Sequence, residues 1–184
     1  MDQQEATKRF YDLIWPHRSV VLRIAQMMTR RLHEAEDLAQ DTLMKAFKAI
    51  EQFDPQSDAK KWLLSILRNA RIDRIRASAS SAGNVSLDQL PMEIEDSQET
   101  SHSGGDENWN DPRRMLEQFS DRDMIAALQD LSEEIRWTLL LVDVEGLDHH
   151  EAAAILNVPV GTIKSRAHRG RAMVRQSLLA VSRR

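Results

Sequence analysis

The residues of this sequence that come nearest to a catalytic centre are two adjacent histidines and the glutamate after them, His149, His150 and Glu151. Neighbouring residues on a helix point about 100° apart, so the two imidazoles would not face one metal ion. The zinc-protease pattern His-Glu-x-x-His would need a histidine where Ala154 stands. The chain has no cysteine, which excludes thiolate catalysis and disulfides, and it has no glycine-rich phosphate loop or nucleophile elbow. We therefore predict a protein that is not an enzyme, with no catalytic residues, no metal site and no cofactor.

A basic segment near the C terminus indicates binding to nucleic acid instead. Residues 158–184 contain seven Lys or Arg and no Asp or Glu. We expect a short helix over residues 149–156 capped by Asp148, a tight turn over 157–161, and a long final helix capped by Thr162. Upstream, Ser132 begins a capping box for a helix that should end at Gly146. Helix, tight turn and basic helix form the helix–turn–helix arrangement, whose second helix enters the major groove of DNA.

Helical periodicity separates the final helix into two faces. The stripe that should pack inward consists of Ile163, Ala167, Gly170, Val174 and Leu178. The opposite face carries Ser165, His168 and Arg169, which can reach base edges. The flanking residues, most of them cations suited to phosphates, are Thr162, Lys164, Arg166, Arg171 and Arg175. A solvated basic face on a bundle helix is the alternative interpretation, but the helix cap, the turn and the absence of acidic residues favour DNA binding.

The periodicity of apolar residues predicts helices on both sides of a central acidic segment. Within residues 5–76 we expect a break at Pro16 and then helices over about 20–28, 34–53 and 59–76. Residues 78–118 have linker composition, apart from apolar residues that could dock onto the domains: Leu87, Leu90, Met92, Ile94 and Trp109. The pattern predicts an all-α protein of two small helical domains, residues 1–77 and 119–184, joined by an acidic flexible linker of residues 78–118.

The formal net charge of −4 conceals a strong division along the chain. Residues 84–112 contain eight Asp or Glu and no Lys or Arg, whereas residues 60–76 contain six Lys or Arg and one acid. Because local charge decides local binding, the acidic segment could fold over the basic surfaces and weaken DNA binding by the free protein. No apolar run approaches the ~20 residues of a membrane helix, and no secretory signal is visible. We expect a cytoplasmic protein without membrane insertion.

The predicted helix over residues 34–53 is two-faced. Its buried stripe is expected to consist of Ala39, Leu43, Ala46, Phe47 and Ile50. The opposite stripe combines an exposed methionine with charged residues and an amide: Asp37, Gln40, Asp41, Met44 and Lys48. Such a face is either a protein-contact surface or a solvated one, and these residues alone do not decide between them.

The sequence resembles bacterial RNA polymerase sigma factors of the extracytoplasmic function (ECF, group IV) class in two places. Their region two is similar to Asp37-x-x-Gln40-Asp41-Thr42, followed by Phe53 and by Trp62-Leu63-x-x-Ile66-x-Arg68-Asn69-x-x-x-Asp73. Their region four is similar to residues 143–147, 151–156 and 158–166. The resemblance covers nearly the whole chain except residues 78–118. It implies an alternative sigma factor that binds core RNA polymerase, directs promoter-specific transcription initiation, and is held inactive by an anti-sigma factor until a signal arrives.

The resemblance also implies which residues make each contact. Polymerase binding, through the β′ clamp helices, would fall to Asp37, Gln40, Asp41, Met44 and Lys45. Capture of the minus-ten element, with one base flipped out, would fall to Asp54, Ser57, Lys60, Lys61, Arg68, Asn69 and Arg71. The minus-thirty-five element would be read by Thr162, Lys164, Ser165, Arg166, His168, Arg169, Arg171 and Arg175, in a domain that meets the β flap. The acidic linker would run through polymerase channels otherwise used by nucleic acid.

An ordinary helix–turn–helix regulator with a helical sensor domain explains residues 131–181 equally well. It leaves unexplained the polar face around Gln40 and the separate basic helix at residues 60–76. On that basic helix Trp62 is expected in the core. Leu64, Ile72 and Ile75 fall on its basic side, where they would either cover the linker or bind an anti-sigma factor.

Overall fold

The structure is a computed structural model that describes residues 2–81 and 121–182. The first part of the chain forms α1 (Gln3–Leu13), η1 (Trp15–His17), α2 (Arg18–Met28), α3 (Leu32–Lys48), η2 (Ile50–Gln52) and α4 (Ala59–Ser81). The second part forms α6 (Asp121–Gln129), α7 (Glu133–Leu139), the π-helical turn η5 (Leu140–Val144), α8 (His149–Leu156) and α9 (Val160–Ser182). The described residues contain no β-strand, and the predicted all-α class is confirmed.

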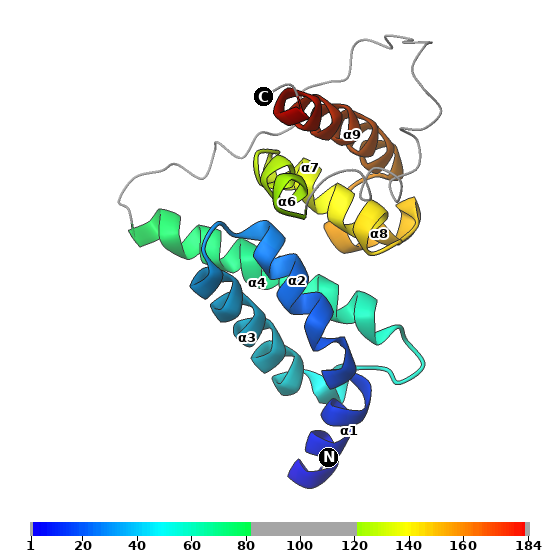
Figure 1. The fold of residues 1–184 in the computed structure, drawn as a ribbon. Coiled ribbons are helices and arrows are strands. Elements are labelled where there is room, and N and C mark those ends of the chain that lie inside the picture. The colour runs from blue at the N-terminus through cyan, green and yellow to red at the C-terminus, as the bar shows by residue number, and fades with distance from the viewer. Residues whose placement is uncertain (1, 82–120, 183–184) are drawn as a thin grey trace.

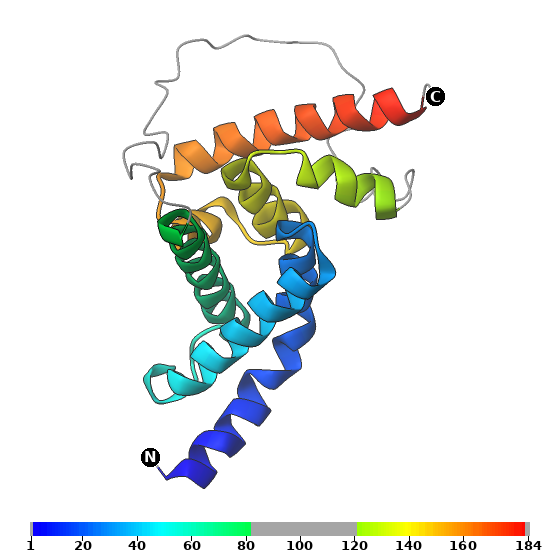
Figure 2. The same cartoon turned by 90° about the vertical axis from the view of Figure 1, so that its left-hand side faces the viewer.

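The two groups of helices are stacked on each other (Figure 1). Helices α2, α3 and α4 form a bundle, α1 extends from its far end, and α6 to α9 lie across the opposite end. Seen from the side, α9 spans the top of the second group, with α6 beneath it and α4 close to α8 (Figure 2). None of the described helices combines the length and the apolar composition needed to cross a membrane.

The first bundle has an apolar core to which three helices contribute. Fully buried side chains meet there, including Ile24 of α2, Leu38 of α3 and Leu67 of α4. Pro16 lies in η1 between α1 and α2, which confirms the predicted break, since proline lacks the N–H that a helix interior needs. Trp62 packs against this core as predicted, and its ring lies 4.8 Å from that of Phe53, centroid to centroid.

Three of the five residues predicted to be buried on the segment of residues 34–53 are buried, Ala39, Ala46 and Ile50, but the buried face of α3 is shifted from Leu43 and Phe47 toward Leu38 and Thr42. Its buried residues are Ala35, Leu38, Ala39, Thr42 and Ala46. These mostly small side chains allow close contact with α2 and α4, and the Thr42 hydroxyl is satisfied by donating to the Leu38 carbonyl at 2.7 Å. The prediction that Phe47 is buried is therefore wrong. Phe47 is 37% exposed and packs edge-on against Phe10 of α1, with ring centroids 5.3 Å apart.

The second group of helices builds its own core around α9. All five residues of the predicted inward stripe, from Ile163 to Leu178, are buried, which confirms this face of the helix. Gly146 ends the preceding helical stretch with a φ of 71°, as predicted. Ser132 is the N-cap of α7 but makes no side-chain capping hydrogen bond, so the capping box predicted there does not form.

Helix α6 is attached to α7 by one arginine that the sequence pattern did not single out. The Arg136 guanidinium donates to the carbonyl oxygens of Leu128, Gln129 and Leu131 at 2.6–2.8 Å. These carbonyls belong to the end of α6 and to the turn that follows it, where helical partners are lacking. Burial lowers the pKa of Arg136, but a guanidinium stays charged at neutral pH.

Several helix boundaries differ from the predicted ones. Helix α3 ends at Lys48 and not at residue 53, and η2 follows it. Helix α4 continues to Ser81, beyond the predicted domain end at residue 77. Helix α9 begins at Val160, and the N–H of Ile163 donates to the Pro159 carbonyl at 3.3 Å. Thr162 therefore lies inside the first turn and not at the cap. Most of the predicted linker, including the five apolar residues named in it, lies outside the described residues.

Close packing of α9 on α7 makes Gly170 a position where a methyl group cannot be added freely. An added Cβ would lie 2.6 Å from Ile135 Cγ2 and 3.0 Å from Leu139. A Cβ at Gly161, in the first turn of the same helix, would meet nothing within 4 Å. Alanine exceeds glycine in helix propensity by about 1 kcal/mol in a helix interior and by no more than that in the first turn, so Gly161→Ala serves as the control that lacks the clash.

We predict that Gly170→Ala is less stable than Gly161→Ala by about 1–3 kcal/mol, the usual cost of overpacking a core. Chemical denaturation of both variants, followed by circular dichroism, measures the difference. Unfolding curves with equal midpoints and slopes for the two variants would show that Gly170 of α9 does not pack closely against Ile135 and Leu139 of α7.

Candidate nucleic-acid interface

The first helix of the helix–turn–helix, α8, is held at its N terminus by a capping box. The Asp148 carboxylate accepts from the N–H groups of His150 and Glu151 at 2.8 and 2.9 Å, and the Glu151 carboxylate accepts from the Asp148 N–H at 2.9 Å. These N–H donors lower the pKa of Asp148 below its ordinary value, the Glu151 N–H most strongly. The predicted cap is confirmed. Among the residues that the structure describes, no three His, Asp or Glu side chains are grouped to hold a metal ion.

A short turn leads from α8 into α9 and sets the angle between them. Asn157 ends α8 in the left-handed conformation, with a φ of 54°, and Pro159 precedes the first residue of α9. The structure places four residues of the predicted DNA face on the exposed side of α9: Lys164, Ser165, His168 and Arg169. Thr162 and Arg166 are partly buried beside them. The exposed residues form one continuous polar and basic face that a DNA groove could approach.

One predicted phosphate contact is already engaged within the domain. The Arg171 guanidinium forms two hydrogen bonds with the Asp143 carboxylate, at 2.6 and 3.0 Å, which raise the pKa of Arg171. Arg175, one turn further along α9, is partly buried. The exposed cations of the predicted set therefore lie in the N-terminal half of α9.

The second basic surface begins at the turn before α4. The Asp54 side chain accepts from the Gln56 N–H at 3.0 Å, and its carbonyl accepts from the Ser57 N–H at 2.9 Å. Asp54 thus shapes an exposed turn from which Ser57 projects. Helix α4 then carries the predicted minus-ten cations, and Asn69 among this set is exposed.

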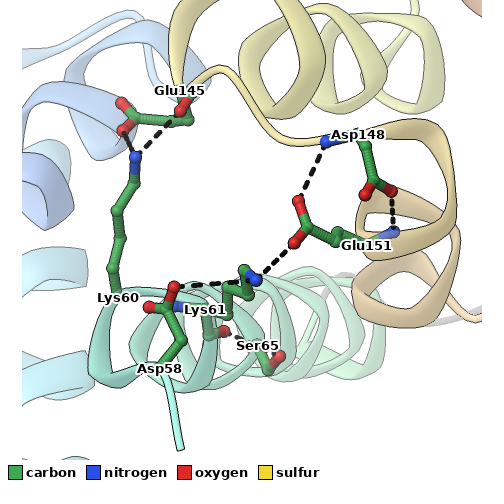
Figure 3. Close-up of polar contacts among 7 residues, drawn as sticks. All are labelled: Asp58, Lys60, Lys61, Ser65, Glu145, Asp148 and Glu151. Carbon is green, nitrogen blue, oxygen red and sulfur yellow. Dashed lines mark hydrogen bonds and ion pairs between the residues drawn. The ribbon is translucent and has the colours of Figure 1, made fainter.

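The two N-terminal cations of α4 are paired with the second domain (Figure 3). Lys60 Nζ lies 3.0 Å from Glu145 Oε2 and donates to the Glu145 carbonyl at 2.9 Å. Lys61 pairs with Glu151, the same carboxylate that closes the capping box of α8. This pairing raises the pKa of Lys61 and lowers that of Glu151. The Glu145 side chain is 1% exposed and also accepts from Arg23 of α2 at 2.7 Å.

The other two cations of the predicted minus-ten set also contact the second domain. Arg68 donates to the carbonyl of Leu156, the last residue of α8, at 3.0 Å, and its burial lowers its pKa. Arg71 forms two hydrogen bonds with the Glu133 carboxylate at the start of α7, at 3.2 and 3.3 Å. Leu64, on the same side of α4, is fully buried. The prediction that Leu64 is available to the linker or to an anti-sigma factor is therefore wrong.

The predicted polymerase face on α3 is only partly free. Asp37, Gln40 and Met44 are exposed, Met44 by 53%. Asp41 and Lys45 are linked to each other at 3.5 Å, and Lys45 Nζ is 2.8 Å from Asp73 of α4, which raises the pKa of Lys45. Gln40 and Met44 also line an apolar groove of about 980 Å³ between α1, α2 and α3, together with Phe10, Tyr11, Trp15, Leu22 and Phe47.

The acidic partners of α4 are the residues that sequence reasoning missed. Glu133, Glu145 and Glu151 lie 62, 85 and 90 residues from the cations that they contact. No spacing rule connects residues so far apart. The available signal was chemical: residues 60–76 carry six cations and only one acid, so most of the acids that pair with them had to come from elsewhere in the chain.

Comparison with known proteins agrees with this division into two functional parts. Residues 13–81 match the family described as Sigma-70 region 2, and residues 121–174 match Sigma-70, region 4. The chain is 31% identical to the ECF RNA polymerase sigma factor SigE of Mycolicibacterium smegmatis, over 95% of this chain and 63% of that protein. It is 30% identical to the ECF RNA polymerase sigma factor SigW of Bacillus subtilis, over 92% of this chain and 88% of that protein.

A solved structure is similar over almost its full length. It is the sigma factor RpoE in complex with the anti-sigma factor NepR from Bartonella quintana, with a TM-score of 0.70 and 27% identity, covering 93% of this chain and 97% of that chain. The chain thus spans less than two thirds of SigE but nearly all of RpoE. With both sigma regions matched and SigW aligned over most of its length, the chain belongs to the ECF RNA polymerase sigma factors.

Proposed function

We propose that this protein is a group IV alternative sigma factor that binds core RNA polymerase in the cytoplasm and directs initiation at a specific set of promoters. The observation that carries the proposal is the presence of basic helices on two different domains, α4 and α9, beside an exposed polar face on α3. Recognition of two promoter elements and one large enzyme requires three such surfaces. An ordinary helix–turn–helix regulator would require only α9.

The exposed face of α9 is assigned to the minus-thirty-five element. Ser165, His168 and Arg169 are placed to meet base edges, and Arg169 can bond a guanine through two donors. Lys164 and Arg166 beside them, with Thr162, are assigned to phosphates, which position a helix without reading sequence. Arg171 and Arg175 would join them only after rearranging the contacts that they already make in this structure.

The turn at residues 54–57 and α4 are assigned to the minus-ten element. Asp54 and Ser57 frame an exposed turn that could receive a flipped base. The strand contacts are assigned to Lys60, Lys61, Arg68, Asn69 and Arg71. Flipping a base costs a few kcal/mol, so this step needs the additional contacts of the polymerase complex.

The face of α3 with Asp37, Gln40, Asp41, Met44 and Lys45 is assigned to the β′ clamp helices, and the second domain is assigned to the β flap. Apolar surface around Met44 supports this assignment, because exposed methionine and aromatic side chains are common at protein interfaces. The similar RpoE was solved with the anti-sigma factor NepR, and we extend an anti-sigma partner to this protein. Ile75, which is 40% exposed on α4, is a candidate contact for it.

Run-off transcription with purified core polymerase over a promoter library tests the whole proposal. We expect transcripts from a restricted set of promoters only when this protein is added. Absence of such transcripts, together with failure to co-purify with core polymerase, would leave the ordinary regulator as the better interpretation.

We predict that Gln40→Ala combined with Met44→Ala weakens binding to core polymerase by about tenfold or more, equivalent to about 1.4 kcal/mol. Both side chains are exposed, so the free energy of unfolding should change by no more than ~0.5 kcal/mol. Binding is measured by titrating labelled sigma factor with core enzyme. His33→Ala, an exposed change near the start of α3, is the control. Equal affinities for the double variant and this control would remove the face from the interface.

We predict that Arg169→Ala weakens transcription in a way that depends on the base at one minus-thirty-five position, with ~1–3 kcal/mol of discrimination lost. Lys164→Ala, an equally exposed change on α9, should weaken all promoters alike, because a phosphate contact carries no base preference. A substitution series of the minus-thirty-five element, transcribed with each variant, measures both effects. A uniform loss with Arg169→Ala would mean that this residue does not read bases.

A further inference from the structure

We propose that the free protein is autoinhibited by an interdomain lock, in which groups of the second domain occupy the cations that α4 needs for promoter DNA. The lock is the set of contacts that joins Lys60, Lys61, Arg68 and Arg71 to Glu145, Glu151, the Leu156 carbonyl and Glu133. The inference rests on the proposed role of α4 in minus-ten recognition. It goes beyond that role because it names what must be displaced before DNA can bind.

Each of the four cations of the predicted minus-ten set has its own acceptor residue on the second domain. For three of the cations this acceptor is a glutamate carboxylate, which is negatively charged and accepts through oxygen, as a DNA phosphate does. Carboxylates and phosphates therefore compete for the same donors, and the closed protein cannot offer these cations to a DNA strand.

The contacts of the lock differ in burial, which separates an anchor from exchangeable pairs. The Glu145 side chain is 1% exposed and is held by both Arg23 and Lys60. The Glu151 and Glu133 side chains are 30% and 32% exposed, so solvent and salt reach them. A strand of DNA could displace the exposed pairs first, whereas Glu145 leaves its site only when the domains separate.

The lock covers one DNA-binding surface and leaves the other surfaces accessible. Ser165, His168 and Arg169 of α9 remain exposed, and so do Gln40 and Met44 on α3. Polymerase can therefore reach α3 while the domains are closed. Binding of the two domains at separate places on the enzyme would then favour the open state by its differential affinity, and α4 would be released only in the complex.

The test uses the full chain and neutralises the two exposed carboxylates with Glu133→Gln and Glu151→Gln. Glutamine at position 151 can still accept the Asp148 N–H, so the capping box is retained. Opening is followed by energy transfer between dyes on Gln52→Cys and Ala172→Cys, both at exposed positions of a chain that has no other cysteine. Binding is measured at low salt with two probes of random sequence, a single-stranded and a duplex oligodeoxynucleotide.

We expect the double variant to lose part of the energy transfer, because the Glu145 anchor remains, and the triple variant with added Glu145→Gln to lose most of it. The double variant should bind the single strand roughly three- to tenfold more tightly than wild type, a modest gain because each displaced pair is partly exposed. Affinity for the duplex, which the exposed face of α9 can already reach, should change much less. The control is Glu134→Gln. Glu134 is exposed and lies beside Glu133 on the same helix. This substitution should change neither the energy transfer nor the binding.

Three results would overturn the lock. Unchanged energy transfer in the double variant and in a triple variant with added Glu145→Gln would show that these carboxylates do not hold the domains together. Equal gains in affinity for the single-stranded and the duplex probe would indicate that the loss of two negative charges, and not the unmasking of α4, strengthens binding. Opening without tighter binding to the single strand would show that the contacts do not mask α4. Promoter-specific transcription by wild type with core polymerase is scored separately, so failure of the lock is distinguished from failure of the proposed function.

Discussion

The relation between the two domains depends on one buried carboxylate. Glu145 is shielded from water and is held by Arg23 of α2 and Lys60 of α4. Pairing offsets the lost solvation of this carboxylate without adding much net stability, and removal of a partner would leave the buried charge less compensated. The pairing therefore favours the arrangement in which both cations reach Glu145. Because Gly146 turns the chain toward α8 directly after this residue, the helix–turn–helix is attached to the first domain at the point where it begins.

Small residues determine how the helix–turn–helix presents the exposed face of α9 that we propose reads bases. Ala167 and Gly170 are buried where α9 crosses α7, and the space there is too narrow for a further methyl group. The capping box of α8 and the left-handed Asn157 set the other side of the turn. The exposed residues Ser165, His168 and Arg169 are thus carried on a helix whose orientation is determined by packing, which a sequence-reading surface requires.

The charge distribution explains how a protein with a net charge of −4 can bind DNA. The cations that we assign to DNA are on α4 and α9, and carboxylates of the second domain pair with three of those on α4. The cations of α4 can then donate to carboxylates in the closed protein and to phosphates when a promoter is bound. Local fields, and not the total charge, decide which partner is bound.

The sequence by itself determined the helices, the break at Pro16, the cap at Asp148 and the inward stripe of α9, because each depends on residues within a few turns of one another. It was less reliable for α3, where Phe47 turned outward to meet Phe10 of another helix. Only the tertiary structure decided that Lys60 meets Glu145 and that Arg71 meets Glu133. Such pairs join residues 62–90 positions apart, and their contact depends on how two finished surfaces fit, which no local periodicity encodes.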